Sequence, residues 1–168
     1  MSGFGTAFIA LRAIVYTTLF LGGWLWLAWW AHRQDYLLAV WLPGWTMGLG
    51  VGLMVIGAAL ALACVATFVV RGRGTPAPFD APREFVATGP YRWVRNPMYI
   101  GGFLLLTGYA LCAGSVAALP VAFAMLAVTH LVAVLYEEPT LRRRFGSSYE
   151  EYVRSTPRWL PRLPARRG

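Results

Sequence analysis

Charged residues are scarce in this chain, and lysine is missing altogether. Its 168 residues include 15 basic side chains, all of them arginine, and seven acidic ones, so 13% are charged while 58% are hydrophobic. Soluble domains average about 25% charged residues. Together with a mean hydropathy of +0.54, this scarcity excludes an ordinary soluble domain and indicates an integral membrane protein.

The arginines give the chain a formal net charge of +8, but they do not form the basic face of a nucleic-acid-binding domain. They flank hydrophobic runs instead. Arginine at such positions sets the orientation of membrane helices and attracts anionic lipid headgroups. We therefore expect membrane lipids as partners and exclude nucleic acid.

Long apolar runs decide the fold class, because lipid cannot satisfy free backbone groups and only helices or closed barrels cross a bilayer. Residues 45–70 contain no charge over 26 positions, about 39 Å of helix against a hydrocarbon core of about 30 Å. We predict an all-α integral membrane protein with a single membrane domain. The four predicted transmembrane helices cover residues 8–31, 45–70, 97–112 and 116–136.

The last two predicted helices form a hairpin. Residues 96–136 contain no Asp, Glu, Lys or Arg over 41 positions, which as one helix would measure about 61 Å, twice the membrane core. The run must therefore fold back, and Ala113, Gly114 and Ser115 are the best turn. Pro120 then falls in the first turn of the returning helix, where its missing N–H costs little.

Arginine counts predict the orientation. The loop of residues 71–95 holds five arginines and the tail of residues 137–168 holds eight, whereas the hairpin turn holds none. The positive-inside rule places both segments, and both termini, on the cytoplasmic side. In the tail, Gly146 predicts a break between two short amphipathic helices, the second starting with a capping box from Ser147 to Glu150.

Residue types that bind metals or form catalytic triads are few. Cys64 and Cys112 both lie inside apolar runs, where packing explains them. His32 and His130 fall on opposite sides of the predicted membrane and cannot share one metal ion or haem. Neither a cysteine cluster, nor a dinucleotide-binding glycine motif, nor a Ser-His-Asp set occurs, so we expect no metal.

Residues 89–102, GPYRWVRNPMYIGG, carry the strongest functional signal. Arginines, tyrosines and an Asn-Pro step crowd the start of the third predicted span, and the hairpin returns Glu137 and Glu138 to the same membrane face. The alternative is that two glutamates at a helix end are solvated or paired with Arg142 to Arg144.

These motifs resemble a known family. GPYRWVRNPMYIG at residues 89–101, EEPTL at 137–141, FGSSYEEY at 145–152 and PRWLP at 157–161 occur in the order found in the isoprenylcysteine carboxyl methyltransferase and phospholipid methyltransferase superfamily. The resemblance covers about residues 83–163. It implies an integral protein of a bacterial cytoplasmic membrane that takes S-adenosylmethionine (SAM) from the cytoplasm and methylates a lipophilic acceptor.

The resemblance also implies which residues hold the donor, while it assigns no catalytic residue. Aromatic faces attract a sulfonium, carboxylates accept from hydroxyls or ammonium, and arginine or loop N–H groups hold a carboxylate. The implied SAM-binding residues are Arg83, Glu84, Phe85, Val86, Tyr91, Asn96, Pro97, Met98, Tyr99, Glu137 and Glu138.

Two positions depart from the family pattern. Asn96 stands where many members have His, and an amide can hydrogen-bond but cannot carry a proton. Ala133 stands where the prenylcysteine enzymes have an acceptor-binding arginine. Two alternatives therefore stay open: a non-catalytic membrane adaptor or lipid-binding protein on the same bundle, and an NADPH-dependent membrane reductase of related architecture. The acceptor can be a carboxylate, a thiol or an amine.

Overall fold

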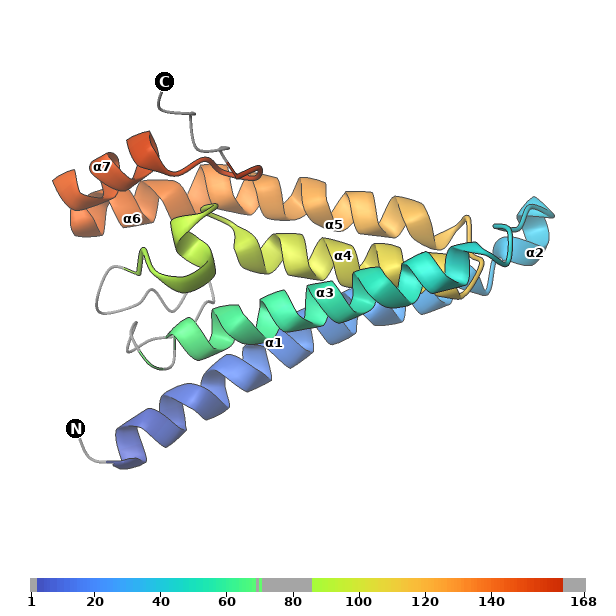
Figure 1. The fold of residues 1–168 in the computed structure, drawn as a ribbon, viewed down its shortest axis with the longest axis horizontal. Helices are drawn as coiled ribbons and strands as arrows, with labels where there is room; N and C mark the ends of the chain where they lie inside the picture. Colours follow the sequence, from blue (N-terminus) through green and yellow to red (C-terminus); the bar gives the residue numbers. More distant parts are fainter. Residues whose placement is uncertain (1–2, 69, 71–85, 162–168) are drawn as a thin grey trace, which may run out of the picture.

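The computed structural model describes residues 3–68, 70 and 86–161, and the elements in these residues are helical (Figure 1). Their order along the chain is α1 (Gly3–His32), α2 (Asp35–Leu38), α3 (Thr46–Thr67), the 3-10 helix η2 (Gly89–Arg92), α4 (Pro97–Cys112), α5 (Ala118–Val132), the π-helix η3 (Ala133–Glu137), α6 (Glu138–Phe145) and α7 (Ser147–Ser155). The all-α class predicted from the sequence is confirmed.

Three stretches of the described chain are long and apolar enough to cross a membrane: Ile14–Leu38, Thr46–Thr67 and Ala118–Phe145. The protein is therefore an integral membrane protein. Helix α4 is equally apolar but has only 16 residues, about 24 Å at 1.5 Å per residue. A fourth crossing and the cytoplasmic orientation of the termini stay predictions.

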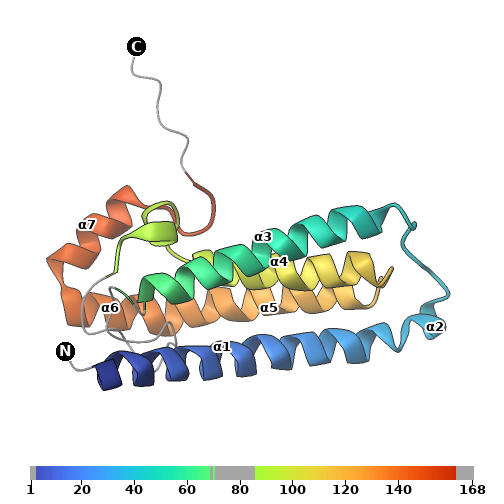
Figure 2. The same ribbon diagram turned by 60° about the horizontal axis from the view of Figure 1, so that its bottom comes forward.

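Helices α3, α4 and α5 lie side by side, and α1 runs along α4 and α5 (Figures 1 and 2). The α3–α4 contact is built from glycines: a Cβ on Gly57 would lie 2.6 Å from the carbonyl oxygen of Gly101, and one on Gly108 would lie 2.6 Å from that of Gly50. Small residues let the two backbones approach this closely, as in other membrane helix pairs.

The hairpin between α4 and α5 turns where the sequence predicts. Gly114 adopts a φ of +65°, a conformation that glycine takes without a Cβ penalty, and the Ser115 hydroxyl accepts from the N–H of Ala118 at 3.0 Å. Buried Asp35 of α2 accepts from the N–H of Ala117 at 2.8 Å. The end of α1 is thereby fixed to the hairpin turn.

The second arm of the hairpin differs from the predicted helix of residues 116–136. It is α-helical only to Val132 and continues as the π-helix η3 into α6. Gly146, with a φ of +52°, separates α6 from α7 as predicted. The predicted capping box is wrong: Ser147 already belongs to α7, and among the described residues no side chain caps its start. Helices η2, α6, α7 and the start of α1 gather at one end of the bundle (Figure 1).

Candidate functional site

A hydrogen bond between the two arms of the hairpin marks the candidate site. Tyr99, in the first turn of α4, donates from its hydroxyl to a carboxylate oxygen of Glu137 at 2.5 Å. Glu137 is the last residue of η3, and the two positions are 38 residues apart in the chain. The hairpin thus brings together the two motif segments that the sequence places on one membrane face.

Glu138, the next residue, faces a different set of partners. Its carboxylate accepts from Arg95 at 3.0 Å, from Nε of Arg158 at 2.8 Å and from Nη2 of Arg158 at 3.1 Å. A two-point bond of this kind between guanidinium and carboxylate is among the stronger hydrogen-bonded pairs in proteins. Glu138 therefore has a structural role. The alternative reading of the sequence paired the two glutamates with Arg142 to Arg144, but Arg142 forms its ion pair with Glu150, at 3.2 Å.

The C-terminal tail takes part in the same cluster. The N–H of Arg95 donates to the carbonyl of Pro157 at 2.9 Å, and that of Asn96 donates to the carbonyl of Arg158 at 3.3 Å. Further along the tail, the indole N–H of Trp159 donates to Nδ1 of His130 on α5 at 3.3 Å. The tail therefore fixes the backbone just before α4. The sequence did not predict the hydrogen bonds from the Arg158 side chain to Glu138, because the two residues are 20 positions apart and no local pattern links them.

Asn96 precedes the first residue of α4, the buried Pro97. Within the described chain its side chain forms no cap for the helix, and its Nδ2 is buried without a hydrogen-bond partner. A buried amide nitrogen left in this way costs free energy unless a ligand or water accepts from it. Asn96 thus has spare hydrogen-bonding capacity, as does Arg95, whose Nε is also buried without a partner in the described chain.

Other predicted site residues belong to an apolar cluster. Val86 and Tyr91 are buried with Cys64 and Phe68, and Met98 packs against them. The ring of Phe68 meets that of Tyr91 edge to face at 5.1 Å. Burial raises the pKa of Tyr91 well above its ordinary value, so its hydroxyl stays protonated. Arg83, Glu84 and Phe85 lie outside the described residues.

Helix α7 contacts this apolar cluster through a hydrogen bond. The hydroxyl of Tyr152 donates to the carbonyl of Tyr91 at 2.6 Å. Burial also raises the pKa of Tyr152, so that this donor keeps its proton at physiological pH. Tyr152, the last residue of the FGSSYEEY motif, therefore supports the turn η2.

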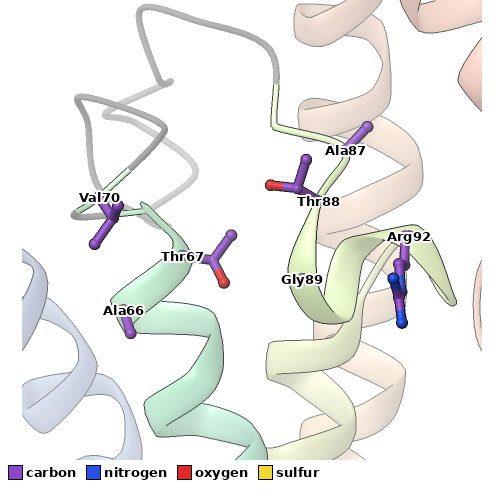
Figure 3. Close-up of a pocket in the computed structure, with 7 residues that line it drawn as sticks. All are labelled: Ala66, Thr67, Val70, Ala87, Thr88, Gly89 and Arg92. Carbon is purple, nitrogen blue, oxygen red and sulfur yellow. The ribbon is translucent and has the colours of Figure 1, made fainter.

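A pocket of about 490 Å³ opens between the end of α3 and η2 (Figure 3). It is lined by Ala66, Thr67, Val70, Ala87, Thr88, Gly89 and Arg92. Among the residues implied by the resemblance, those that the structure describes do not line it. Thr67 and Thr88 face each other across the gap, while Arg92 extends from η2 beyond Gly89 (Figure 3). No cluster of three or more His, Cys, Asp or Glu side chains able to hold a metal ion occurs in the described part of the chain.

Comparison with known proteins identifies the class. Residues 45–148 match the family model described as phospholipid methyltransferase, so the chain belongs to this family, as the motifs predicted. A segment of 83 residues is 35% identical to the nickel-cobalt-cadmium resistance protein NccN of Alcaligenes xylosoxydans xylosoxydans. The match covers 48% of this chain and 37% of NccN, so the chain spans little more than a third of that relative's length.

Proposed function

We propose that the protein is a SAM-dependent methyltransferase whose acceptor is a lipophilic or membrane-associated molecule. The proposal rests on the hydrogen bond between Tyr99 and Glu137, together with the unpartnered side-chain amide of Asn96, three residues before Tyr99. These groups come from the two ends of one hairpin, at the end of the bundle where η2, α6 and the tail lie (Figure 1).

The residues present fit the chemical groups of SAM. Glu137 can accept from ribose hydroxyls or from an ammonium, because Tyr99 donates to only one of its two oxygens. Asn96 Nδ2 can donate to a carboxylate, and the ring of Tyr99 can attract a cation. When bound, SAM supplies a methyl group activated by its sulfonium. Glu138, Val86, Tyr91, Pro97 and Met98 support this proposed site by holding its backbone in place.

The chain's contribution to the reaction is positioning and the exclusion of water. Methyl transfer is an in-line displacement and needs no protein nucleophile. An amine acceptor needs a base to remove its proton, whereas a carboxylate or thiolate does not. Because Asn96 carries no titratable proton, we favour an acceptor that reacts as an anion.

Titration calorimetry of the full-length protein in lipid nanodiscs with S-adenosylhomocysteine, the demethylated form of the donor, tests the proposal. We expect saturable binding to the wild type and to the surface variant Glu151→Gln, and weaker binding to Glu137→Gln. Absence of binding to a wild-type sample that unfolds cooperatively on heating would rule out this donor site.

A further inference from the structure

Helix α1 lies outside residues 45–148 that match the family model, yet it packs directly on the hairpin. A Cβ on Gly102 of α4 would lie 3.2 Å from Cδ2 of Leu21, and Ala28 is fully buried in a cluster with Leu106 and Met125. Helices α1 and α4 run in the same direction along the bundle (Figures 1 and 2). Positions before Leu21 are therefore nearer to the end where Asn96 and Tyr99 lie.

Phe20 is the residue of α1 that meets the candidate site. Its ring lies 6.3 Å from that of Tyr99 and 6.5 Å from that of Trp24. The Tyr99 side chain thus contacts Glu137 through its hydroxyl and Phe20 through its ring. Since Phe20 is 40% exposed, its ring reaches the surface of the bundle while it contacts Tyr99.

Thr17 lies one helical turn closer to the Asn96 end than Phe20 and Leu21. Its Oγ1 is buried, and the described chain offers it no hydrogen-bond partner. A threonine inside a helix can satisfy its hydroxyl by donating to the carbonyl four residues before it. Thr67 does this with Ala63 at 2.7 Å, and Thr129 does it with Met125 at 2.8 Å. The buried hydroxyl of Thr17 lacks this bond, as does that of Thr107 on α4. Of the two, Thr17 is the one on the same helix as Phe20, three residues before it.

We propose that α1 forms the acceptor side of the active site: Thr17 hydrogen-bonds to the polar group of the acceptor, and Phe20 packs against its apolar chain. The acceptor class is an amphiphile whose chain stays in the lipid along α1 while its polar end reaches Tyr99. This inference rests on the proposed methyltransferase activity. It assigns acceptor selectivity to the helix that the family model does not cover.

The chain supplies matched controls on the same helix. Thr18 and Leu19 are exposed neighbours of Thr17 and Phe20. Thr18→Val therefore makes the same change as Thr17→Val on the exposed side, and Leu19→Ala is a comparable truncation of a large apolar side chain there. The test variants are Thr17→Val, Thr17→Ser and Phe20→Ala. Each protein is assayed in mixed micelles with methyl-labelled SAM and a total bacterial lipid extract, and its affinity for S-adenosylhomocysteine is measured in parallel.

We expect Thr17→Val and Phe20→Ala to raise the half-saturating concentration of lipid extract about fivefold or more, or to change which labelled products form. Donor affinity should change less than half-saturation: it should stay within about twofold of the wild type for Thr17→Val, whose hydroxyl does not touch the donor. For Phe20→Ala, whose ring packs on Tyr99, the change in donor affinity should be smaller than the change in half-saturation. Thr17→Ser, which keeps the hydroxyl, should restore wild-type behaviour. Retained donor binding also shows that the variants fold.

Two results overturn the inference, and they differ. If the wild type transfers label but Thr17→Val and Phe20→Ala match Thr18→Val and Leu19→Ala in half-saturation and products, the role of α1 is refuted while the methyltransferase function stands. If the wild type binds no S-adenosylhomocysteine and transfers no label, the proposed function fails, and the acceptor role of α1 fails with it.

Discussion

Tyr99 and Glu137 form a hydrogen bond across the hairpin, whereas the neighbouring Glu138 is bound by Arg95 and Arg158. Two adjacent carboxylates therefore have separate tasks. One has an oxygen left to accept from a ligand, and the other fastens the C-terminal tail to the loop before α4. This division decides which of the two should affect donor binding and which should affect stability.

The first prediction concerns Glu137. Glu137→Gln keeps the size of the side chain but removes its charge, and hydrogen bonds to charged groups contribute about 1.5–3 kcal/mol. We expect its dissociation constant for S-adenosylhomocysteine to rise at least about tenfold, with a smaller rise for Tyr99→Phe. Calorimetry measures both values, and equal affinities for Glu137→Gln and the exposed control Glu151→Gln would refute the assignment.

The second prediction concerns the tail. Arg158→Ala removes two of the three hydrogen bonds to Glu138, a side chain only 12% exposed, and should lower the free energy of unfolding by about 1–3 kcal/mol. Arg158→Lys should not restore it, because an ammonium cannot form the two-point bond. Thermal unfolding in detergent tests this against Arg143→Ala on the exposed face of α6, and a shift no larger than in that control would contradict it.

The third prediction concerns the α3–α4 contact. Gly57→Ala places a methyl group 2.6 Å from the carbonyl oxygen of Gly101 and should destabilise the bundle by about 1–3 kcal/mol, as overpacked sites do. Gly48→Ala is the matched control on the same helix, since nothing described lies within 4 Å of its Cβ position. It should be neutral or stabilising, because alanine is the better helix former. Equal melting temperatures for the two variants would argue against this packing.

The fourth prediction concerns alkaline pH. Burial raises the pKa of Tyr152 above its unfolded value of about 10, so above that pH the unfolded chain has lost a proton that the folded chain keeps. The contribution of Tyr152 to the free energy of unfolding is therefore fully present below about pH 10 and falls as the pH rises further. At neutral pH, Tyr152→Phe should be about 1 kcal/mol less stable than the wild type, because it loses the hydrogen bond to Tyr91. Above about pH 10 its free energy of unfolding should fall less steeply with pH than that of the wild type. Melting curves at several pH values check the slopes, and parallel slopes would contradict the linkage.

Sequence patterns predicted the hairpin because its cause is visible along the chain. A run of 41 residues without charge is too long for one crossing and contains one good turn. Since its two arms have similar lengths, Tyr99 near the start and Glu137 near the end return to the same level. The return of these two segments to the same end of the bundle thus followed from hydrophobic length, whereas the hydrogen bond between the two side chains did not.

Other features could not be read from local patterns. The bonds from Arg158 to Glu138 depend on how the tail folds back. The change from α- to π-helix at Ala133 leaves no signal in the local sequence. The sequence of α1 is apolar on every side, so nothing distinguishes Thr17 from Thr18 until the helix is seen against the hairpin. The capping box failed because Gly146 takes a positive φ and leaves Ser147 inside α7.

The most direct test of the proposed methyltransferase activity is transfer of a labelled methyl group from SAM into a lipid extract by the purified full-length protein. We expect an organic-soluble labelled product that appears with the wild type and with Glu151→Gln, and that falls at least about tenfold at limiting donor with Glu137→Gln. A wild type that binds S-adenosylhomocysteine yet labels no lipophilic product would contradict this activity and support a binding protein that keeps the family fold.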